Sequence, residues 1–297
     1  EDTMKRESKS ADRLYKMFIY TVLITFAISI IVPVSWVFIA SLKENSEFAG
    51  SPWKLPKGFY IQNFVDAFQK AKMGESLFNS VFVTALALVL LIIVALPASY
   101  VLARFEFRGK KFWNSFMKAG LFINVNYIVI PIFLMLLGGD KILRQSKIIE
   151  KSFFLDNLFV LAIIYMTTAL PFTIYLLSNF FQSLPSTFEE AAAIDGADHF
   201  TTMVKVMAPM ARPSIITVIL FNFLAFWNEY IIALTLLPGP KKTLPVGLMS
   251  LMAASKGAAQ YGILYAGMVI VMLPTLVLYI IVQQKLTQGM TLGGTKE

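Results

Sequence analysis

Residues 189–213 read EEAAAIDGADHFTTMVKVMAPMARP, and this polar stretch lies between two long apolar segments. It contains two helix-like pieces that are joined by Asp195 and Gly196. A connector that served only as a spacer would not need two such pieces separated by a sharp turn. The stretch therefore predicts a docking element on the surface of a membrane that the flanking apolar segments cross.

Local signals predict a short helix in the first half of this stretch. Ser186 can cap the free amides at its start, and Glu189, three residues later, can return the hydrogen bond as in a capping box. The alanines at 191–193 favour a helix strongly. Gly196 can adopt the left-handed conformation that ends this helix.

The second half of the stretch predicts another short helix. Asp198 can cap its start, and Pro209 with Pro213 marks where it ends and where the next apolar span begins. The expected arrangement is helix, sharp turn, helix. A purely structural interpretation, an amphipathic hairpin that holds two spans in register, fits the same signals.

The composition predicts an integral membrane protein, because 57% of the 297 residues are hydrophobic and only 15% are charged. A helix needs about 20 apolar residues to cross roughly 30 Å of hydrocarbon. The expected fold is all-α with six transmembrane helices, at residues 17–42, 77–103, 113–137, 157–181, 214–237 and 262–284. The first is too long, and lacks a small-residue cleavage site, for a removed signal peptide, so it is expected to remain as an anchor.

The chain offers little for metal or nucleophilic chemistry. It has no cysteine and one histidine, His199, which excludes disulfides and leaves little for zinc or histidine-based catalysis. We therefore expect no catalytic residue and no metal ligand. The net charge of +8 does not indicate nucleic-acid binding, because the basic residues are scattered through the loops.

The distribution of Lys and Arg predicts the orientation. With the N-terminus inside, the cytoplasmic segments hold thirteen Lys and Arg residues, or fourteen with Lys118 in the expected span 113–137, against twelve in the outward loops, so the bare total decides little. The local density of basic residues decides more, because Lys and Arg close to the ends of spans favour the cytoplasmic side most strongly. Five of the first sixteen residues are basic, and four basic residues lie within 104–111, both next to expected spans. Residues 1–16, the loop 182–213 and the tail 285–297 are then cytoplasmic, around a six-helix transmembrane domain at 17–284. The loops 43–76, 138–156 and 238–261 face outward and are expected to be small ordered caps.

Polar side chains within the expected spans indicate a translocation path, because ionisable groups at membrane depth are costly and face a bundle interior or a cavity. Glu229 is the one acidic side chain placed inside a span, and either helix packing or direct contact with a transported solute can explain it. Amide, carboxylate and aromatic side chains can together bind a hydroxyl-rich solute such as a sugar. The expected path residues are Trp227, Asn228, Glu229 and Tyr230 in the fifth span and Asn124 and Asn126 in the third.

These motifs resemble those of a known family. Glu190-Ala191-Ala192, then Asp195-Gly196-Ala197, then Pro209 are similar to the EAA loop of the permease subunits of ATP-binding-cassette (ABC) importers. The Trp227–Tyr230 segment and the tail 288–296 resemble the carbohydrate branch of that family, the maltose-type second permease, over the chain from about residue 15 onward. Two positions depart from the pattern, Ala208 and Met210 on either side of Pro209.

The resemblance implies a division of labour among subunits. The chain lacks a Gly-x-x-x-x-Gly-Lys-Ser/Thr phosphate loop, so ATP and Mg²⁺ would bind to two separate ATP-binding subunits, and this chain would bind no cofactor. Its other partners would be a second permease subunit, an extracellular solute-binding protein and the sugar, in a bacterial-type cytoplasmic membrane. The residues expected to dock on the ATP-binding subunit are Glu189, Glu190, Ala191, Ala192, Asp195, Gly196, Ala197 and Pro209, with Glu190 meeting a charged partner.

The tail offers a second expected contact. Gly289, Gly293 and Gly294 would leave an extended chain that can lie in a groove between the ATP-binding subunits, and simple fraying is the alternative. Other classes of function also remain. A permease for a polyamine would use Glu229 as the cation partner. An ion-coupled secondary transporter would not need the docking hairpin, and a membrane enzyme would need a catalytic constellation that is missing here.

Overall fold

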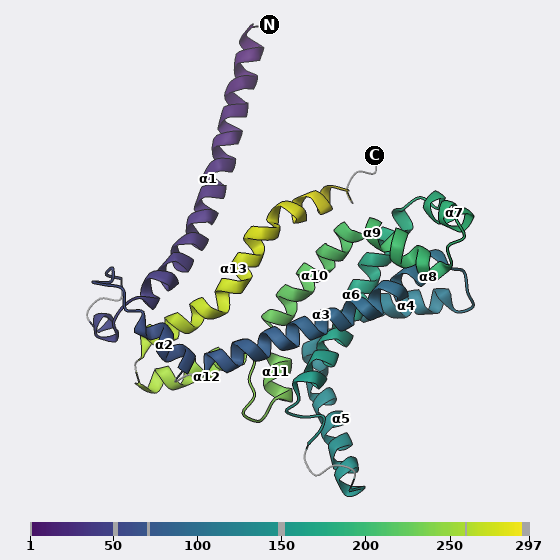
Figure 1. The fold of residues 1–297 in the computed structure, drawn as a ribbon. Coiled ribbons are helices and arrows are strands. Elements are labelled where there is room, and N and C mark those ends of the chain that lie inside the picture. Colours follow the sequence, from purple (N-terminus) through teal and green to yellow (C-terminus); the bar gives the residue numbers. More distant parts are fainter. Residues whose placement is uncertain (1, 50–52, 70–71, 148–151, 259, 293–297) are drawn as a thin grey trace. The chain divides into compact units, whose positions relative to one another are not determined.

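A computed structural model describes residues 2–49, 53–69, 72–147, 152–258 and 260–292 (Figure 1). All regular elements in this part of the chain are helices. The chain divides into two compact units. One comprises residues 1–71 with 251–272, and the other residues 72–250 with 273–297.

The first unit contains the long helix α1 (Asp2–Ser41), the 3-10 helix η1 (Asn45–Phe48) and α2 (Gln62–Gln69). Its described loop is organised around the buried side chain of Lys43, whose Nζ donates to the carbonyl of Lys54 at 2.9 Å. The same ammonium lies 4.8 Å from the ring centroid of Phe48 and 5.5 Å from that of Trp36, which stabilises a cation in a buried position. The expected loop 43–76 therefore contains ordered structure, although its last residues, 73–76, already belong to the helix Met73–Arg104, and its outward position stays a prediction.

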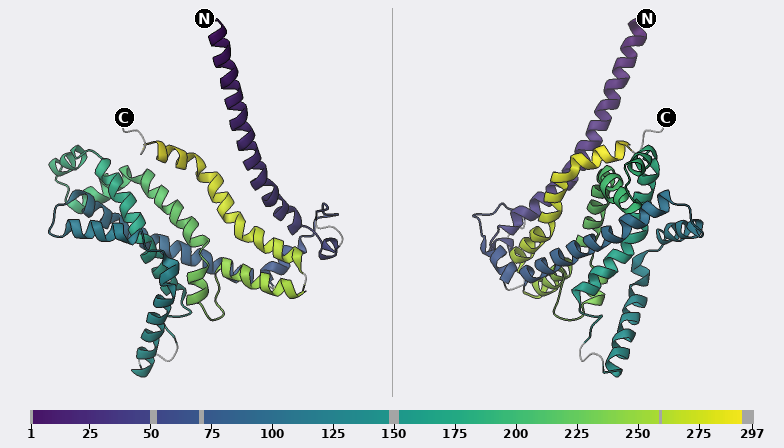
Figure 2. Two further views of the ribbon diagram at one scale, coloured as in Figure 1. Left: turned by 180° about the vertical axis from the view of Figure 1, so that it is seen from behind. Right: turned by 45° about the vertical axis from the view of Figure 1, so that its right-hand side comes forward.

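The second unit is built on two long helices, α3 (Met73–Arg104) and α6 (Leu158–Ser183), which pack along each other (Figures 1 and 2). Both are rich in apolar residues on all sides, as expected of buried membrane helices. One buried cluster includes Val83, Ala87 and Leu91 of α3 with Tyr165 of α6. The elements between and after them are α4 (Lys110–Gly120), α5 (Val125–Gln145), α7 (Thr187–Ile194), α8 (His199–Thr202), the π-helix η2 (Met203–Met207), α9 (Ala208–Met210), α10 (Arg212–Trp227), α11 (Ile231–Leu236), α12 (Leu244–Ala258) and α13 (Tyr261–Leu292). Residues of both α12 and α13 are divided between the two units.

The structure has five to six candidate spans against the six that the sequence predicts, and two of the expected spans are interrupted. Five described helices are long and apolar enough to cross a membrane, and a bent pair formed by His199–Met210 and Arg212–Trp227 makes up to six. The chain therefore has the architecture of a multi-pass membrane protein.

The expected third span, 113–137, is two helices. Helix α4 ends at Gly120, and α5 begins after Asn124, whose side chain accepts a hydrogen bond from the backbone amide of Asn126 at 3.0 Å. Asn124 is a helix cap and interrupts the apolar pattern for that reason. Helix α5 then continues to Gln145, so the expected loop 138–156 was placed too early.

The expected fifth span, 214–237, is also broken. Helix α10 stops at Trp227, and α11 begins only at Ile231. The expected outward loop 238–261 contains α12, which starts beside Pro245, a residue that the first turn of a helix tolerates. Helix α13 extends to Leu292, so residues 285–292 are helical and the prediction of an extended tail from Gly289 was wrong. Gly293 and Gly294 lie outside the described residues.

Candidate functional site: the docking hairpin and the buried carboxylate

The first helix of the predicted hairpin forms, but a different contact holds it. Helix α7 begins at Thr187, and Ser186 makes no side-chain capping hydrogen bond, so the predicted capping box was wrong. The reason is that Glu189 points to α3. Its Oε1 accepts a hydrogen bond from the hydroxyl of Tyr100 at 2.7 Å, and its Oε2 lies 3.3 Å from Nε of Arg104.

Arg104 extends this contact to the connector that precedes α7. Its Nη2 donates to the carbonyl of Leu184 at 2.7 Å, while its side chain is only 14% exposed and that of Glu189 21%. A partly buried carboxylate that pairs with both a hydroxyl and a guanidinium is held more firmly than an exposed ion pair. The hairpin is therefore fastened to the end of a long helix of the bundle.

The turn between the two short helices forms as predicted. Gly196 has a φ of +81°, its amide donates to Ala193 at 3.1 Å, and the amide of Ala197 donates to Ala192 at 2.9 Å. This pair of bonds is the Schellman arrangement that ends helices at a left-handed residue. A Cβ at Gly196 would meet nothing within 4 Å, so glycine serves the backbone conformation and leaves the outer side of the turn open.

The second short helix starts at the predicted cap. The Oδ1 of Asp198 accepts from the amide of Thr201 at 3.0 Å, and the hydrogen bonds from Thr201 lower the pKa of this carboxyl group. The helical chain then continues through η2 past Pro209 to Met210, so Pro209 does not end the piece. The axis turns by 75° around Ala211 before α10 begins, and Pro213 lies in the first turn of α10.

The inner side of the hairpin packs on the bundle. Met203, Met207 and Ala211 are buried in a cluster with Tyr100 of α3 and Phe181 of α6. The hairpin is thus joined to both long helices by packing as well as by the carboxylate contacts.

The outer side of the hairpin is exposed. Ile194 is 87% exposed and Phe200 69%, although both are large apolar residues. Glu190, Ala191, Asp195 and Gly196 are also exposed, whereas Ala192 is buried and Ala197 half-buried. The predicted docking residues therefore fall into an outward group and an inward group, and Glu189 belongs to the inward group.

Glu229 lies at the break between α10 and α11. Its Oε1 accepts from the amide of Ile232 at 2.7 Å, and its Oε2 accepts from the amide of Ala233 at 2.9 Å and from the hydroxyl of Tyr165 at 2.8 Å. The carboxylate thus caps α11 and ties it to α6. Three donors on its two oxygens give Glu229 a packing role between α6 and α11, and its contact with a transported solute stays a prediction.

The other predicted path residues differ in their surroundings. Trp227 is buried and its ring lies 5.5 Å from that of Phe223, while Tyr230 packs against the bundle core. Asn228 is exposed, and its Nδ2 donates to the carbonyl of Leu224 at 2.8 Å. Asn124 and Asn126 are exposed at the start of α5 and contact each other.

Sequence reasoning missed Tyr100, Arg104 and Tyr165. Arg104 counted only as a basic residue next to a span, although its spacing of four from Tyr100 places both side chains on one face of α3. Tyr165 carries no local signal, because its partner lies 64 positions away.

Comparison with known proteins agrees with this architecture. Residues 95–292 match the family described as "Binding-protein-dependent transport system inner membrane component". The chain is 33% identical to the diacetylchitobiose uptake system permease protein NgcG of Streptomyces coelicolor, over 98% of this chain and 92% of the relative. It is 28% identical to the trehalose transport system permease protein SugB of Mycobacterium tuberculosis, over 90% of this chain and 92% of the relative.

A solved structure shares the fold. A chain in the crystal structure of a bacterial ABC transporter involved in the import of the acidic polysaccharide alginate superposes with a TM-score of 0.76, at 24% identity, over 92% of this chain and 97% of that one. The family match and the relatives identify the chain as a membrane-spanning permease subunit of an ABC importer. This chain belongs to the family of binding-protein-dependent transport system inner membrane components.

Proposed function

We propose that the chain forms half of the translocation path for a neutral sugar or oligosaccharide that an extracellular binding protein delivers. The support comes from its membership of a binding-protein-dependent family and from relatives that are named for diacetylchitobiose and trehalose transport. A second permease subunit completes the path.

In this proposal, ATP is hydrolysed on two separate subunits and the hairpin transmits their movement. The exposed Ile194 and the open turn at Gly196 provide the contact surface, and the Tyr100–Glu189–Arg104 contacts carry the displacement to α3. Interfaces commonly place an apolar side chain at the centre of such a contact. The movement reaches the bundle as a rigid-body rotation.

The orientation follows from the dense basic segments, with the hairpin and both termini on the cytoplasmic side of a bacterial-type membrane. The end of α13 around Gly289 then lies on the side of the ATP-binding subunits, where the tail can make a second contact. Because Glu229 makes hydrogen bonds that hold α6 and α11 together, and because the relatives above are named for the uptake of sugars, the proposal favours a neutral sugar over a polyamine.

Reconstitution in vesicles tests the proposal. The purified chain alone, supplied with ATP, is expected to accumulate no sugar, whereas the assembled transporter with its binding protein accumulates a neutral oligosaccharide against its gradient. Competition with a polyamine is expected to leave this uptake unchanged. Uphill accumulation by the chain alone, or inhibition by the polyamine, would contradict the proposal.

A further inference from the structure

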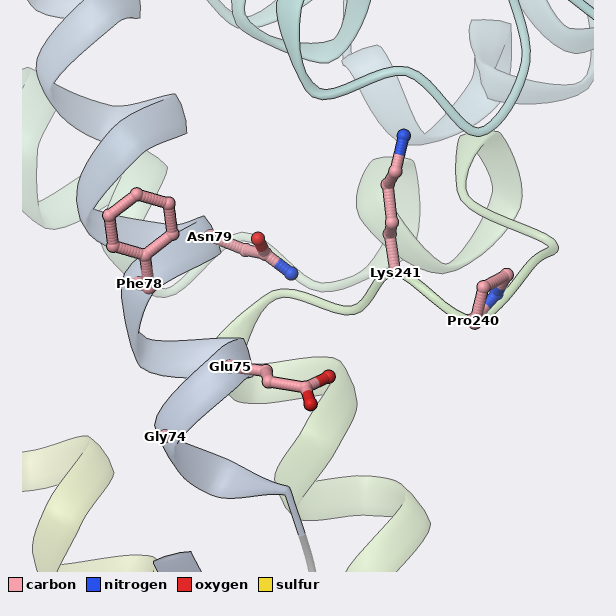
Figure 3. A pocket seen from close by; sticks show the side chains of 6 residues that line it. All are labelled: Gly74, Glu75, Phe78, Asn79, Pro240 and Lys241. Carbon is pink, nitrogen blue, oxygen red and sulfur yellow. The ribbon is translucent and has the colours of Figure 1, made fainter.

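A groove at the beginning of α3 lies apart from all the path residues that the sequence indicates. Its volume is about 480 Å³, within the range of roughly 300–1,000 Å³ that is common for small-molecule sites. Figure 3 shows one wall formed by α3 and the opposite wall formed by the loop before α12. The lining residues are Gly74, Glu75, Phe78, Asn79, Pro240 and Lys241.

Direct hydrogen bonds fix the distance between the two walls. The Nδ2 of Asn79 donates to the carbonyl of Lys242 at 3.0 Å, and the amide of Leu244 donates to the hydroxyl of Ser80 at 2.7 Å. The groove is therefore already formed in the chain by itself, which lowers the entropic cost of binding a ligand.

The loop wall is also tied to the segment before α6. The Nζ of Lys241 donates to the carbonyl of Asp156 at 2.9 Å. A Cβ at Gly239 would lie 2.4 Å from the Oδ2 of Asp156, so the loop approaches this segment only because residue 239 is glycine. Both ends of the loop wall are thus held in place.

The helix wall presents a carboxylate and an aromatic ring to the groove. Glu75, Phe78 and Asn79 follow the i, i+3, i+4 spacing that puts side chains on one face of a helix. Phe78 is 69% exposed, and within the described part of the chain Glu75 makes no side-chain hydrogen bond or ion pair. Figure 3 shows the Glu75 carboxylate directed into the space between the walls.

This combination of groups suits a carbohydrate. A carboxylate accepts hydrogen bonds from sugar hydroxyls, an ammonium group donates to sugar oxygens, and an aromatic ring covers the C–H face of the sugar. The ammonium of Lys241 has three donors and uses one on Asp156. Because the charges of Glu75 and Lys241 cancel, the groove favours a neutral glycan, and a uronate chain would bring its own carboxylates close to Glu75.

We propose that this groove is a subsite for a neutral glycan at the outer mouth of the translocation path, where the sugar is held after it leaves the binding protein. The inference rests on the proposed function, including the orientation that places the start of α3 outside. It adds a site of defined chemistry, centred on Glu75, Phe78 and Lys241, to a path that the sequence located only deeper in the bundle.

The absence of cysteine from the natural sequence allows a direct test. Pro240→Cys places one thiol on the loop wall and leaves Glu75, Phe78 and Lys241 intact. The assembled transporter, with partners that carry no reactive cysteine, is labelled with a maleimide in nanodiscs. Gly58→Cys is the matched control, because a Cβ there meets nothing within 4 Å and residue 58 does not line the groove.

The probes are diacetylchitobiose and trehalose, with an alginate disaccharide as the acidic counterpart. A transported neutral sugar at about twice its Kd is expected to slow labelling of the Pro240→Cys variant about threefold, because only the free site reacts. The acidic disaccharide and the Gly58→Cys control are expected to show no change. Uptake of the same sugars is measured in the same preparation.

The outcomes separate this inference from the proposed function. Sugar uptake without protection at position 240 refutes the groove and leaves the proposed function standing, whereas absence of uptake of either neutral sugar contradicts the proposed function. A third outcome also overturns the inference: the binding protein without sugar slows labelling at position 240, whereas the sugar does not. The groove would then be a contact surface for the binding protein.

A second set of variants keeps the test independent of labelling. Phe78→Ala and Glu75→Gln are expected to raise the apparent KM for neutral sugar by several-fold. Phe82→Ala is the control, since Phe82 is an exposed ring of α3 that does not line the groove. An equal effect of Phe82→Ala would show that the change reflects the helix surface and not the groove.

Discussion

Tyr100→Phe isolates the contact that fastens the docking hairpin to α3. The substitution removes one hydroxyl and keeps the ring, which packs against Phe105 and Phe181. The lost hydrogen bond is 2.7 Å long and its acceptor is the carboxylate of Glu189. A hydrogen bond to a charged group contributes about 1.5–3 kcal/mol to stability.

The lower end of that range, about 1.5 kcal/mol, applies here. Glu189 is 21% exposed and keeps its ion pair with Arg104, so water can partly replace the lost donor. A loss of about 1.4 kcal/mol corresponds to a factor of ten in an equilibrium constant. Local opening of α7 should therefore become roughly tenfold more frequent, while the rest of the bundle keeps its stability.

Hydrogen exchange of the assembled, nucleotide-free transporter measures this opening. Amides of residues 188–197 in the Tyr100→Phe variant should exchange roughly tenfold faster than in the wild type, under conditions in which exchange follows the opening equilibrium. Tyr127→Phe is the matched control, because the side chain of Tyr127 is 83% exposed. Unchanged exchange in α7, or an equal increase in the control, would refute the fastening role of Tyr100.

Three further predictions concern single positions. Glu229→Ala leaves the hydroxyl of Tyr165 and two amides of α11 without their acceptor. The stability of the assembled complex should therefore fall by about 2–5 kcal/mol. An unchanged melting temperature would contradict the capping role of Glu229. Gly196→Val places a branched residue at a φ of +81°, at a cost of about 1–2 kcal/mol. This variant should transport less sugar per ATP hydrolysed, and Gly196→Asn should have a smaller effect. A wild-type ratio in the valine variant would contradict the role of the turn in coupling. Asp140→Ala removes the acceptor for the amides of residues 153–155, so that segment should exchange hydrogen faster, and equal protection would show that the carboxylate is dispensable.

The features that could be predicted from sequence are those with local causes. The turn at Gly196 and the cap at Asp198 depend on a few neighbouring residues, and the structure shows both. The apolar runs predicted six spans because their length alone sets that expectation. The resemblance to importer permeases rested on the same local motif and is confirmed by the family match.

The features that could not be predicted depend on contacts between distant residues. Glu189 could, by its sequence position, either form a capping box with Ser186 or bind to α3. Only the position of Tyr100 in the fold decides between these two roles. The breaks at Asn124 and Asn228 were missed because apolar residues continue on both sides of them. A count of apolar residues along the chain therefore gives one long segment where the structure has two helices. Glu229 showed that a polar group was needed there, but not that α11 and Tyr165 are its partners.

The ratio of sugar transported to ATP hydrolysed tests most directly whether the exposed side of the hairpin couples the bundle to the ATP-binding subunits. Glu190→Lys reverses a charge on that side, and Glu106→Lys reverses a charge on an 88% exposed side chain outside the hairpin. In the assembled transporter, Glu190→Lys is expected to lower the ratio strongly with normal complex yield, while Glu106→Lys keeps the wild-type ratio. A wild-type ratio in the Glu190→Lys transporter would contradict the account.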